Sequence, residues 1–268
     1  MKNISVLLFL LITLALNAQN NKTSGLNARQ FHKYWKVESE SPDYKVTFLG
    51  DTVEILSPKG LTLWRKEKMS GKVTIEYDAC VVVEVEGDRL SDLNCFWMAS
   101  DPQYPDNIWK REKWRSGIFL NCYSLQLYYM GYGGNHNSTT RFRRYDGNEA
   151  AITNAKARPA ILKEYTDADH LLEANKWYHI KITNENNRVS YYINGVRLVD
   201  FRDADPLTEG WFGFRTTLSR TRIANFHYEC SSQEISEIPL HWIGDTPQQD
   251  RTVSLGVPFS EGELYPEN

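Results

Sequence analysis

The feature that most constrains the fold of this chain is a succession of short segments rich in β-branched and aromatic residues, each bounded by Gly, Asn, Asp or Pro. Such segments are typical of β-strands, and the bounding residues are typical of turns. Helix is scarce, with at most one turn at 167–174. The pattern predicts an all-β fold, a two-sheet antiparallel β-sandwich. We expect strands at residues 44–48, 52–56, 72–86, 93–98, 117–120, 125–130, 140–145, 177–184, 188–193, 211–216 and 222–228.

The strongest local signal is Asn194-Gly195, which lies between the apolar runs 189–193 and 196–201. Asn-Gly tolerates the positive φ angles that a two-residue hairpin turn requires. We therefore expect these two runs to pair as a β-hairpin.

The two ends of the chain differ from its strand-rich middle. Residues 1–18 combine a basic start at Lys2, an apolar run and the small residue Ala18, which is the pattern of a secretory signal peptide. Residues 233–268 lose the strand alternation and are interrupted by prolines. We expect a signal peptide at 1–18, one β-sandwich domain at 19–232 and an extended C-terminal tail at 233–268. The protein is then periplasmic or secreted.

Charge excludes some partners. The chain has 31 basic and 34 acidic residues, for a formal net charge of -3. This balance produces no global field to attract nucleic acid. Positive charge is instead local, at 110–115 and 141–144, which favours a small anionic ligand. After the signal peptide, no stretch is long and apolar enough to span a membrane.

The cysteines indicate neither a metal site nor redox chemistry. Cys80, Cys95, Cys122 and Cys230 could form two disulfides in an oxidising compartment or remain buried thiols. Their spacing fits no zinc site. We expect no metal in the site and no cofactor, although Asp101, Asp106 or Asp203 could hold a structural calcium.

The segment most suited to binding is 128–147, which reads YYMGYGGNHNSTTRFRRYDG. Its glycines allow a tight turn, and the flanking residues would meet if they pair as a hairpin. Phenols can stack on sugar rings, amides can bind hydroxyls, and arginines can grip a carboxylate or sulfate. The segment therefore suits a polyhydroxylated, anionic ligand, although an exposed ladder of arginine and tyrosine would share the pattern.

Period-2 alternation assigns residues of four strands to opposite faces. The predicted core face carries Leu93, Cys95, Trp97, Leu125, Leu127, Phe142, Phe212 and Phe214. The predicted outer face carries Asn94, Tyr128, Tyr132, Arg141, Arg143, Tyr145, Trp211 and Arg215. We expect this outer face to form the site, together with Arg115, Asn135 and His136.

Several longer segments resemble a known family. They are 92–99, 115–117, 132–135, 139–147 and 207–215. These segments resemble a family of secreted bacterial proteins with a concanavalin A-like sandwich, a jelly roll, found in systems that degrade uronate-containing polysaccharides. The resemblance covers residues 43–228. Its nearest functional likeness is the ulvan oligosaccharide dehydratase, which removes water from a non-reducing-end glucuronate and leaves a 4,5-unsaturated uronate.

Such an elimination needs a neutralised carboxylate, a base for the proton on C5 and an acid for the leaving hydroxyl. Arg141, Arg143 and Arg215 suit the first role, and Tyr128, Tyr132 and His136 are candidates for proton transfer. The expected substrate-binding residues are Asn94, Arg115, Asn135, Tyr145, Trp211 and Arg215. The expected partner is an anionic, uronate-containing oligosaccharide that could also carry sulfate.

Two other functions fit the same surface. A non-catalytic carbohydrate-binding module would use the same aromatic and arginine side chains, and an endo-acting polysaccharide lyase would expel a sugar instead of water. Glycoside hydrolysis is disfavoured, because Glu76-Tyr77-Asp78 is followed by Val81 where the Glu-x-Asp-x-x-Glu pattern needs its last glutamate.

Overall fold

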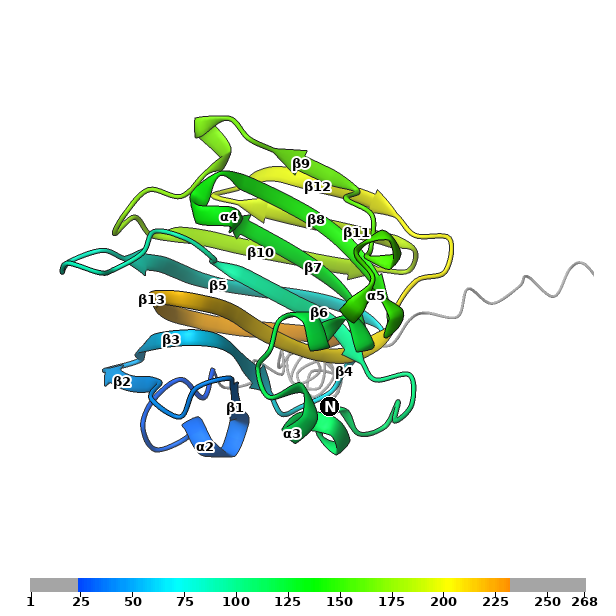
Figure 1. The fold of residues 1–268 in the computed structure, drawn as a ribbon, viewed down its shortest axis with the longest axis horizontal. Coiled ribbons are helices and arrows are strands. Elements are labelled where there is room, and N and C mark those ends of the chain that lie inside the picture. Colours follow the sequence, from blue (N-terminus) through cyan, green and yellow to red (C-terminus); the bar gives the residue numbers. More distant parts are fainter. Residues whose placement is uncertain (1–23, 232–268) are drawn as a thin grey trace, which may run out of the picture. The chain divides into compact units, whose positions relative to one another are not determined.

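The computed structural model describes residues 24–231, so the expected signal peptide and C-terminal tail lie outside the described residues. The described chain forms an antiparallel β-sandwich (Figure 1). The front sheet contains β6 (Asn94–Ser100), β7 (Gln126–Gly133), β8 (Thr139–Asp146) and β9 (Lys163–Tyr165). The back sheet contains β5 (Lys72–Val82), β10 (Tyr178–Glu185), β11 (Arg188–Ile193) and β12 (Val196–Arg202).

One long strand, β13 (Glu209–Ser231), belongs to both sheets. Its first half pairs with β6 and its second half pairs with β5. The register against β3 shifts between Thr217 and Ser219, and such an irregularity allows a strand to bend. The remaining strands are β1 (Trp35–Ser39), β2 (Lys45–Leu49), β3 (Thr52–Arg65), which runs beside β13, and β4 (Met69–Ser70).

The helices are short and lie in the connections. They are α2 (Phe31–Tyr34), η1 (Ile108–Arg111), α3 (Glu112–Arg115), η2 (Leu120–Ser124), α4 (Gly134–Asn137), α5 (Ala150–Thr153), η3 (Ala155–Ala157) and η4 (Ala168–His170). The predicted strand at 117–120 is wrong. Ser116 and Gly117 have φ angles of 48° and 67°, so the chain turns there and enters η2 instead of extending.

The hairpin predicted at Asn194-Gly195 is confirmed. Ile193 and Val196 face each other across β11 and β12. Asn194 and Gly195 have φ angles of 50° and 81°, as a turn with two positive φ values requires.

Two apolar clusters cover the two faces of the front sheet. The main core lies between the sheets, where the rings of Trp97 and Tyr191 are 6.3 Å apart and those of Phe142 and Phe201 are 5.5 Å apart. A second cluster lies on the outer face of β6 and β7 and includes side chains from η1, η2 and α5. The front sheet is therefore partly buried on both faces.

This double burial inverts the predicted faces of β7. Tyr128 and Tyr132 point into the main core, whereas Leu127 and Tyr129 belong to the outer cluster. Because leucine and tyrosine are both buried here, the position of leucine did not identify the core face. The predicted core positions of Leu93, Cys95, Trp97, Phe142, Phe212 and Phe214 are confirmed.

Cys80, Cys95 and Cys122 are buried thiols. Within 24–231, no helix has the length and apolar character needed to cross a membrane.

Candidate functional site

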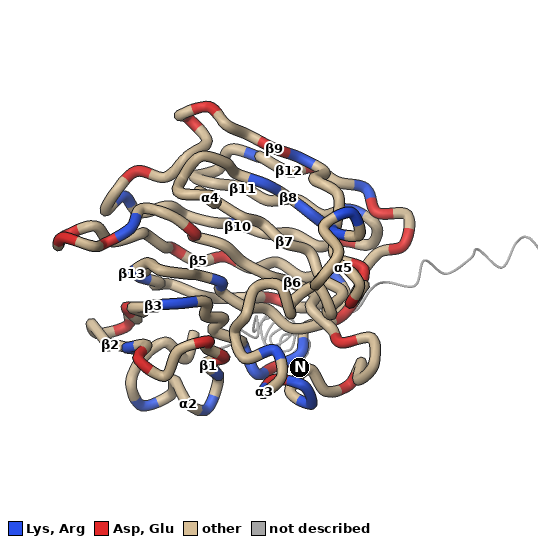
Figure 2. Tube along the Cα trace, viewed as in Figure 1, with Lys and Arg blue, Asp and Glu red and all other residues tan. Residues whose placement is uncertain are grey.

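A pocket of about 460 Å³ opens on the outer face of the front sheet, within the size range of small-molecule sites. β8 contributes several basic side chains to it, and the basic positions of this strand are visible in Figure 2. The η2 helix and the turn at α4 also contribute. The lining residues are Glu40, Arg89, Asp92, Asn94, Phe119, Tyr123, Tyr129, Gly131, Gly134, Asn135, His136, Thr139, Arg141, Arg143, Tyr145, Arg158, Arg215 and Thr217.

Five arginines and two carboxylates line this pocket, so its lining is strongly positive. Arg141 is paired with Glu164 on β9, and Arg89 Nη1 lies 3.1 Å from Asp92 Oδ2. The other three arginines, Arg143, Arg158 and Arg215, have no carboxylate within ion-pair distance among the described residues. Their charge is available to an anionic ligand.

Backbone and ring contacts hold the three uncompensated arginines. Arg143 Nη1 donates to Pro159 O at 2.8 Å, and Arg215 Nη1 donates to Gly117 O at 2.6 Å. The guanidinium of Arg158 lies 5.8 Å from the centre of the Tyr123 ring. Arg143 and Arg215 are therefore oriented before a ligand binds, which lowers the entropic cost of binding.

Phenols line the pocket next to these arginines. The hydroxyl of Tyr129 lies against Gly131, where a Cβ atom would be only 2.4 Å from it. Burial, assisted by the Asp92 carboxylate, raises the pKa of Tyr129, and burial also raises the pKa of Tyr145. Both phenols are thus neutral at physiological pH and can donate a proton or a hydrogen bond.

The turn at α4 places His136 beside the pocket in an unusual backbone conformation. Gly133, Asn135, His136 and Asn137 have φ angles of 66°, 52°, 58° and 57°. The left-handed conformation costs about 1–2 kcal/mol for most residues, and Asn tolerates it better than others. Asn137 stabilises the turn, since Nδ2 donates to Leu172 O and Leu172 N donates to Oδ1, both at 2.8 Å.

Seven of the predicted site residues line the pocket, and they come from four separate elements, β6, α4, β8 and β13. They are Asn94, Asn135, His136, Arg141, Arg143, Tyr145 and Arg215. The roles assigned to them stay predictions.

Tyr128 and Tyr132 do not reach the pocket, because they lie on the opposite face of β7. The Tyr128 hydroxyl donates to Asp203 Oδ2 at 2.7 Å and accepts from Leu207 N at 3.1 Å. The Tyr132 hydroxyl donates to Leu171 O at 3.2 Å. The predicted placement of both tyrosines on the pocket face is therefore wrong.

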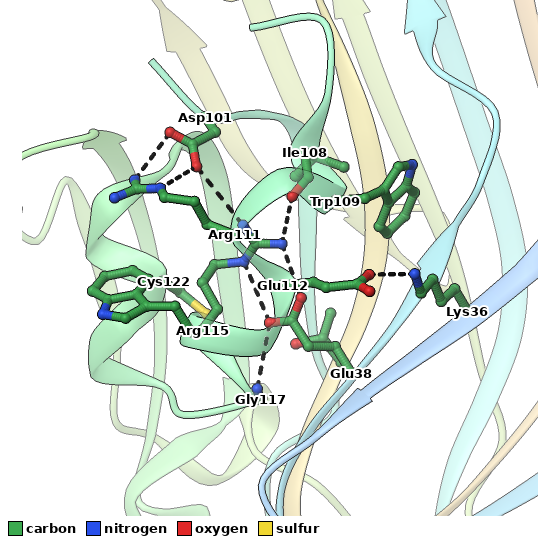
Figure 3. Close-up of polar contacts among 12 residues, drawn as sticks. Lys36, Glu38, Asp101, Ile108, Trp109, Arg111, Glu112, Arg115, Gly117 and Cys122 are labelled. Carbon is green, nitrogen blue, oxygen red and sulfur yellow. Dashed lines mark hydrogen bonds and ion pairs between the residues drawn. The ribbon is translucent and has the colours of Figure 1, made fainter. Parts of the chain in front are cut away.

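Arg115 and Trp211 are buried away from the pocket as well. Arg115 is fully buried, with Nη2 donating to Glu38 Oε2 at 2.9 Å and to Ile108 O at 2.7 Å (Figure 3). Trp211 lies under the edge of Trp109, with ring centres 6.2 Å apart. The predicted placement of both residues at the pocket is wrong, since Arg115 is paired with Glu38 and Trp211, on β13, packs in the second cluster.

The buried ion pair of Glu38 and Arg115 is nevertheless connected to the pocket, through the backbone of Gly117. Gly117 N donates to Glu38 Oε1 at 3.4 Å (Figure 3). The carbonyl of the same glycine accepts the bond from Arg215. Burial raises the pKa of Glu38, and Arg115 opposes this effect. The ion pair thus helps to fix the residue that holds Arg215.

Sequence reasoning missed several lining residues, notably Arg89, Asp92, Tyr129 and Arg158. Tyr129 lay in the predicted binding segment, and a one-residue shift of the face assignment would have found it. Arg89 and Arg158 lie outside strands, where no periodicity indicates direction. No cluster of three or more His, Cys, Asp or Glu side chains within 24–231 is arranged to hold a metal ion.

Comparison with known proteins shows one family match and several related folds. The family model described as a domain of unknown function, DUF6250, matches residues 55–226. No curated protein sequence matches the chain significantly. Among solved structures, a Bacillus subtilis protein of unknown function with a galectin-like fold is 15% identical, with a TM-score of 0.61 over 78% of this chain and 94% of that chain.

Two further structures share the fold. The carbohydrate recognition domain of Emp47p is 11% identical, with a TM-score of 0.51 over 80% of this chain and 96% of its own. The exoplasmic/lumenal domain of VIP36, in its Ca²⁺/Man3GlcNAc-bound form, is 8% identical, with a TM-score of 0.52 over 81% of this chain and 92% of its own. At these identities the likeness shows the fold alone.

Proposed function

The chain belongs to the DUF6250 family of unknown function, and we propose that its pocket binds a uronate residue of an anionic oligosaccharide. The observation that carries this proposal is the convergence of Arg143, Arg158 and Arg215, three arginines without a carboxylate partner among the described residues, on one pocket. Guanidinium groups bind carboxylates through paired, charge-assisted hydrogen bonds. Neighbours with the same fold include a carbohydrate recognition domain, which supports a sugar as the ligand.

The rest of the lining supports a sugar ring rather than a small inorganic anion. Phe119, Tyr123 and Tyr129 provide aromatic surface, and Asn94 and Asn135 provide amides for hydroxyl groups. Sugar sites commonly combine an apolar ring face with polar groups that bind the hydroxyls. The expected secretion would bring such a protein into contact with polysaccharide fragments.

We further propose that the bound uronate is dehydrated by β-elimination. The arginines would neutralise its carboxylate and so make the proton on C5 more acidic. Tyr129 replaces Tyr128 and Tyr132 as a candidate for proton transfer, because it lines the same pocket as the arginines, and His136, already a candidate, lines this pocket too. The neutral phenol of Tyr129 suits protonation of the leaving hydroxyl. A binding module with the same pocket would hold the sugar without changing it.

The proposal is tested with an oligosaccharide that ends in glucuronate. Arg143→Ala should weaken calorimetric binding by about 2 kcal/mol, a value within the range for a charge-assisted hydrogen bond. Arg188→Ala is the matched control, because Arg188 is exposed on the back sheet and paired with Asp200. Equal affinity for the wild type and Arg143→Ala, with both folded, would place the site elsewhere.

Mass spectrometry of the incubated oligosaccharide separates the three functions. A dehydratase yields a product lighter by one water with the same number of sugar units and a new ultraviolet absorbance. A lyase shortens the oligosaccharide, and a binding module leaves it intact. Binding without a change of mass would retain the first part of the proposal and reject dehydration.

A further inference from the structure

A hydrogen bond at the pocket links His136 to a residue 47 positions away in the chain. Arg89 Nε donates to His136 Nδ1 at 3.4 Å. A guanidinium carries only donors and stays charged, so Nδ1 must be the acceptor. Neutral imidazole carries one N–H, which then belongs to Nε2. We infer that Arg89 fixes His136 as the Nε2–H tautomer, so that His136 presents a hydrogen-bond donor, and not a base, to an oxygen atom of the pocket's ligand.

Arg89 is well placed for this role because other contacts fix its guanidinium. Nη1 donates to Thr217 O at 3.1 Å and lies 3.1 Å from Asp92 Oδ2, while Nη2 donates to Ser91 Oγ at 3.2 Å. These partners come from β13 and from the segment before β6. With the Nη atoms held in this way, Nε points at the imidazole, and its direction does not depend on a ligand.

The backbone of His136 is constrained independently. The residue lies within the left-handed turn, and the amide of Asn137 anchors this turn to Leu172 by two hydrogen bonds. Ser138 Oγ also donates to Asn135 O at 2.7 Å. The arginine and the histidine are thus held by different parts of the chain, and each meets the other in a defined position.

The Nε2–H tautomer has a consequence for ligand binding that rests on the proposed function: in a hydrogen bond between His136 and the ligand, His136 is the donor. With Nε2 protonated, His136 adds a donor beside the uncompensated arginines, so this part of the pocket recognises oxygen acceptors such as a carboxylate, a hydroxyl or a glycosidic oxygen. The same tautomer cannot take a proton from carbon through Nε2. In this arrangement Arg89 is a positioning residue and His136 is no longer a candidate base. The C5 proton must then go to another acceptor of the lining, whose carboxylates are Glu40 and Asp92.

The tautomer can be measured directly, without a ligand and without activity. Long-range proton–nitrogen NMR spectra of the ¹⁵N-labelled protein distinguish a protonated from an unprotonated ring nitrogen, and His136→Gln identifies the signals of His136. We expect an unprotonated Nδ1 and a protonated Nε2 at neutral pH. Arg89→Ala should shift the population toward the Nδ1–H form, while Arg188→Ala should leave it unchanged.

Two outcomes would overturn the inference. One is an Nδ1–H tautomer in the wild-type protein, which needs no variant and therefore remains decisive if Arg89→Ala does not fold. The other is an unchanged His136 ring spectrum in a folded Arg89→Ala protein.

A binding experiment tests the consequence separately. Glutamine keeps an N–H donor, so His136→Gln should bind the glucuronate-terminated oligosaccharide about tenfold more tightly than His136→Leu, the effect of about one hydrogen bond. Equal affinities would reject the donor role. If the wild type binds no anionic oligosaccharide at all, the proposed function fails while the NMR result on the tautomer still stands.

Discussion

Adjacent residues of β7 have separate tasks because successive side chains of a strand point to opposite faces. Tyr128 is hydrogen-bonded inside the sandwich, and Tyr129 lies in the pocket. The two tyrosines are chemically identical, so their difference comes entirely from position. They form a matched pair for separating stability from function.

We expect Tyr128→Phe to lower the free energy of unfolding by about 1–3 kcal/mol, because the buried Asp203 carboxylate loses a donor and Leu207 N loses an acceptor. Ligand affinity should not change. Tyr129→Phe should leave stability nearly unchanged and reduce turnover of the uronate substrate by roughly 10²–10⁴-fold, the range for a general acid. Urea unfolding and product assays measure both effects. Lost turnover in Tyr128→Phe, with full turnover in Tyr129→Phe, would reverse the assignment.

At the scale of an element, the turn at α4 combines an unfavourable backbone with side-chain anchors. Its residues after Gly133 include three consecutive non-glycine residues with positive φ. The flanking strands β7 and β8 pair as far as Gly131 and Arg141, and Gly134 forms a further bridge with Thr139, so the chain reverses over residues 135–138. The link from Asn137 to Leu172 offsets part of the conformational cost.

We predict that Asn137→Ala destabilises the protein by about 2–3 kcal/mol, because it removes two hydrogen bonds and replaces asparagine, which tolerates the left-handed region, with alanine, which tolerates it less well. Asn137→Gly removes the same hydrogen bonds but adopts this φ without strain. It should therefore be about 1 kcal/mol less destabilising than Asn137→Ala. Chemical denaturation measures the difference. Equal losses in the two variants would show that the backbone conformation of this turn carries no strain.

At the scale of the whole molecule, the buried ion pair of Glu38 and Arg115 joins β1 to α3 (Figure 3). This helix lies between η1 and η2, whose side chains pack on the outer face of the front sheet. Both side chains are almost entirely inaccessible to solvent. Removing one partner of a buried ion pair leaves the other charge without compensation, which is far more costly than losing an exposed pair. We therefore expect the pair to stabilise the attachment of η1 and α3 to β1.

Arg115→Met should lower the free energy of unfolding by about 3–5 kcal/mol at neutral pH. Burial already raises the pKa of Glu38 above its usual value of 4.5, and loss of Arg115 would raise it further. A carboxyl group with a raised folded-state pKa contributes stability below the unfolded pKa and loses it as the pH rises through the folded pKa. The difference in the free energy of unfolding between the wild type and Arg115→Met should therefore grow between pH 4.5 and neutral pH. A deficit independent of pH in thermal unfolding would contradict this account.

The sequence alone determined the fold class, most strands and part of the site. β-branched and aromatic segments bounded by turn residues predict a sandwich, and Asn194-Gly195 predicts its hairpin, because both signals depend on local backbone preferences. Alternation also placed Arg141, Arg143 and Arg215 correctly on the pocket face. In their strands the neighbouring phenylalanines lie in the main core, so the apolar residues did identify the inner face.

Only the tertiary structure decided the remaining side-chain directions. Alternation divides a strand into two faces but does not say which face is covered by another segment, and β7 is covered on both. Arginine is a residue type that often binds anionic ligands, yet Arg115 is buried in the interior, where it is paired with Glu38, a residue distant in the sequence. Arg89 and Arg158 reach the pocket from outside the strands, where direction depends on long-range packing rather than on a local period. The local sequence therefore predicts the secondary structure of the segments that form the pocket. Which of their side chains meet there depends on long-range contacts.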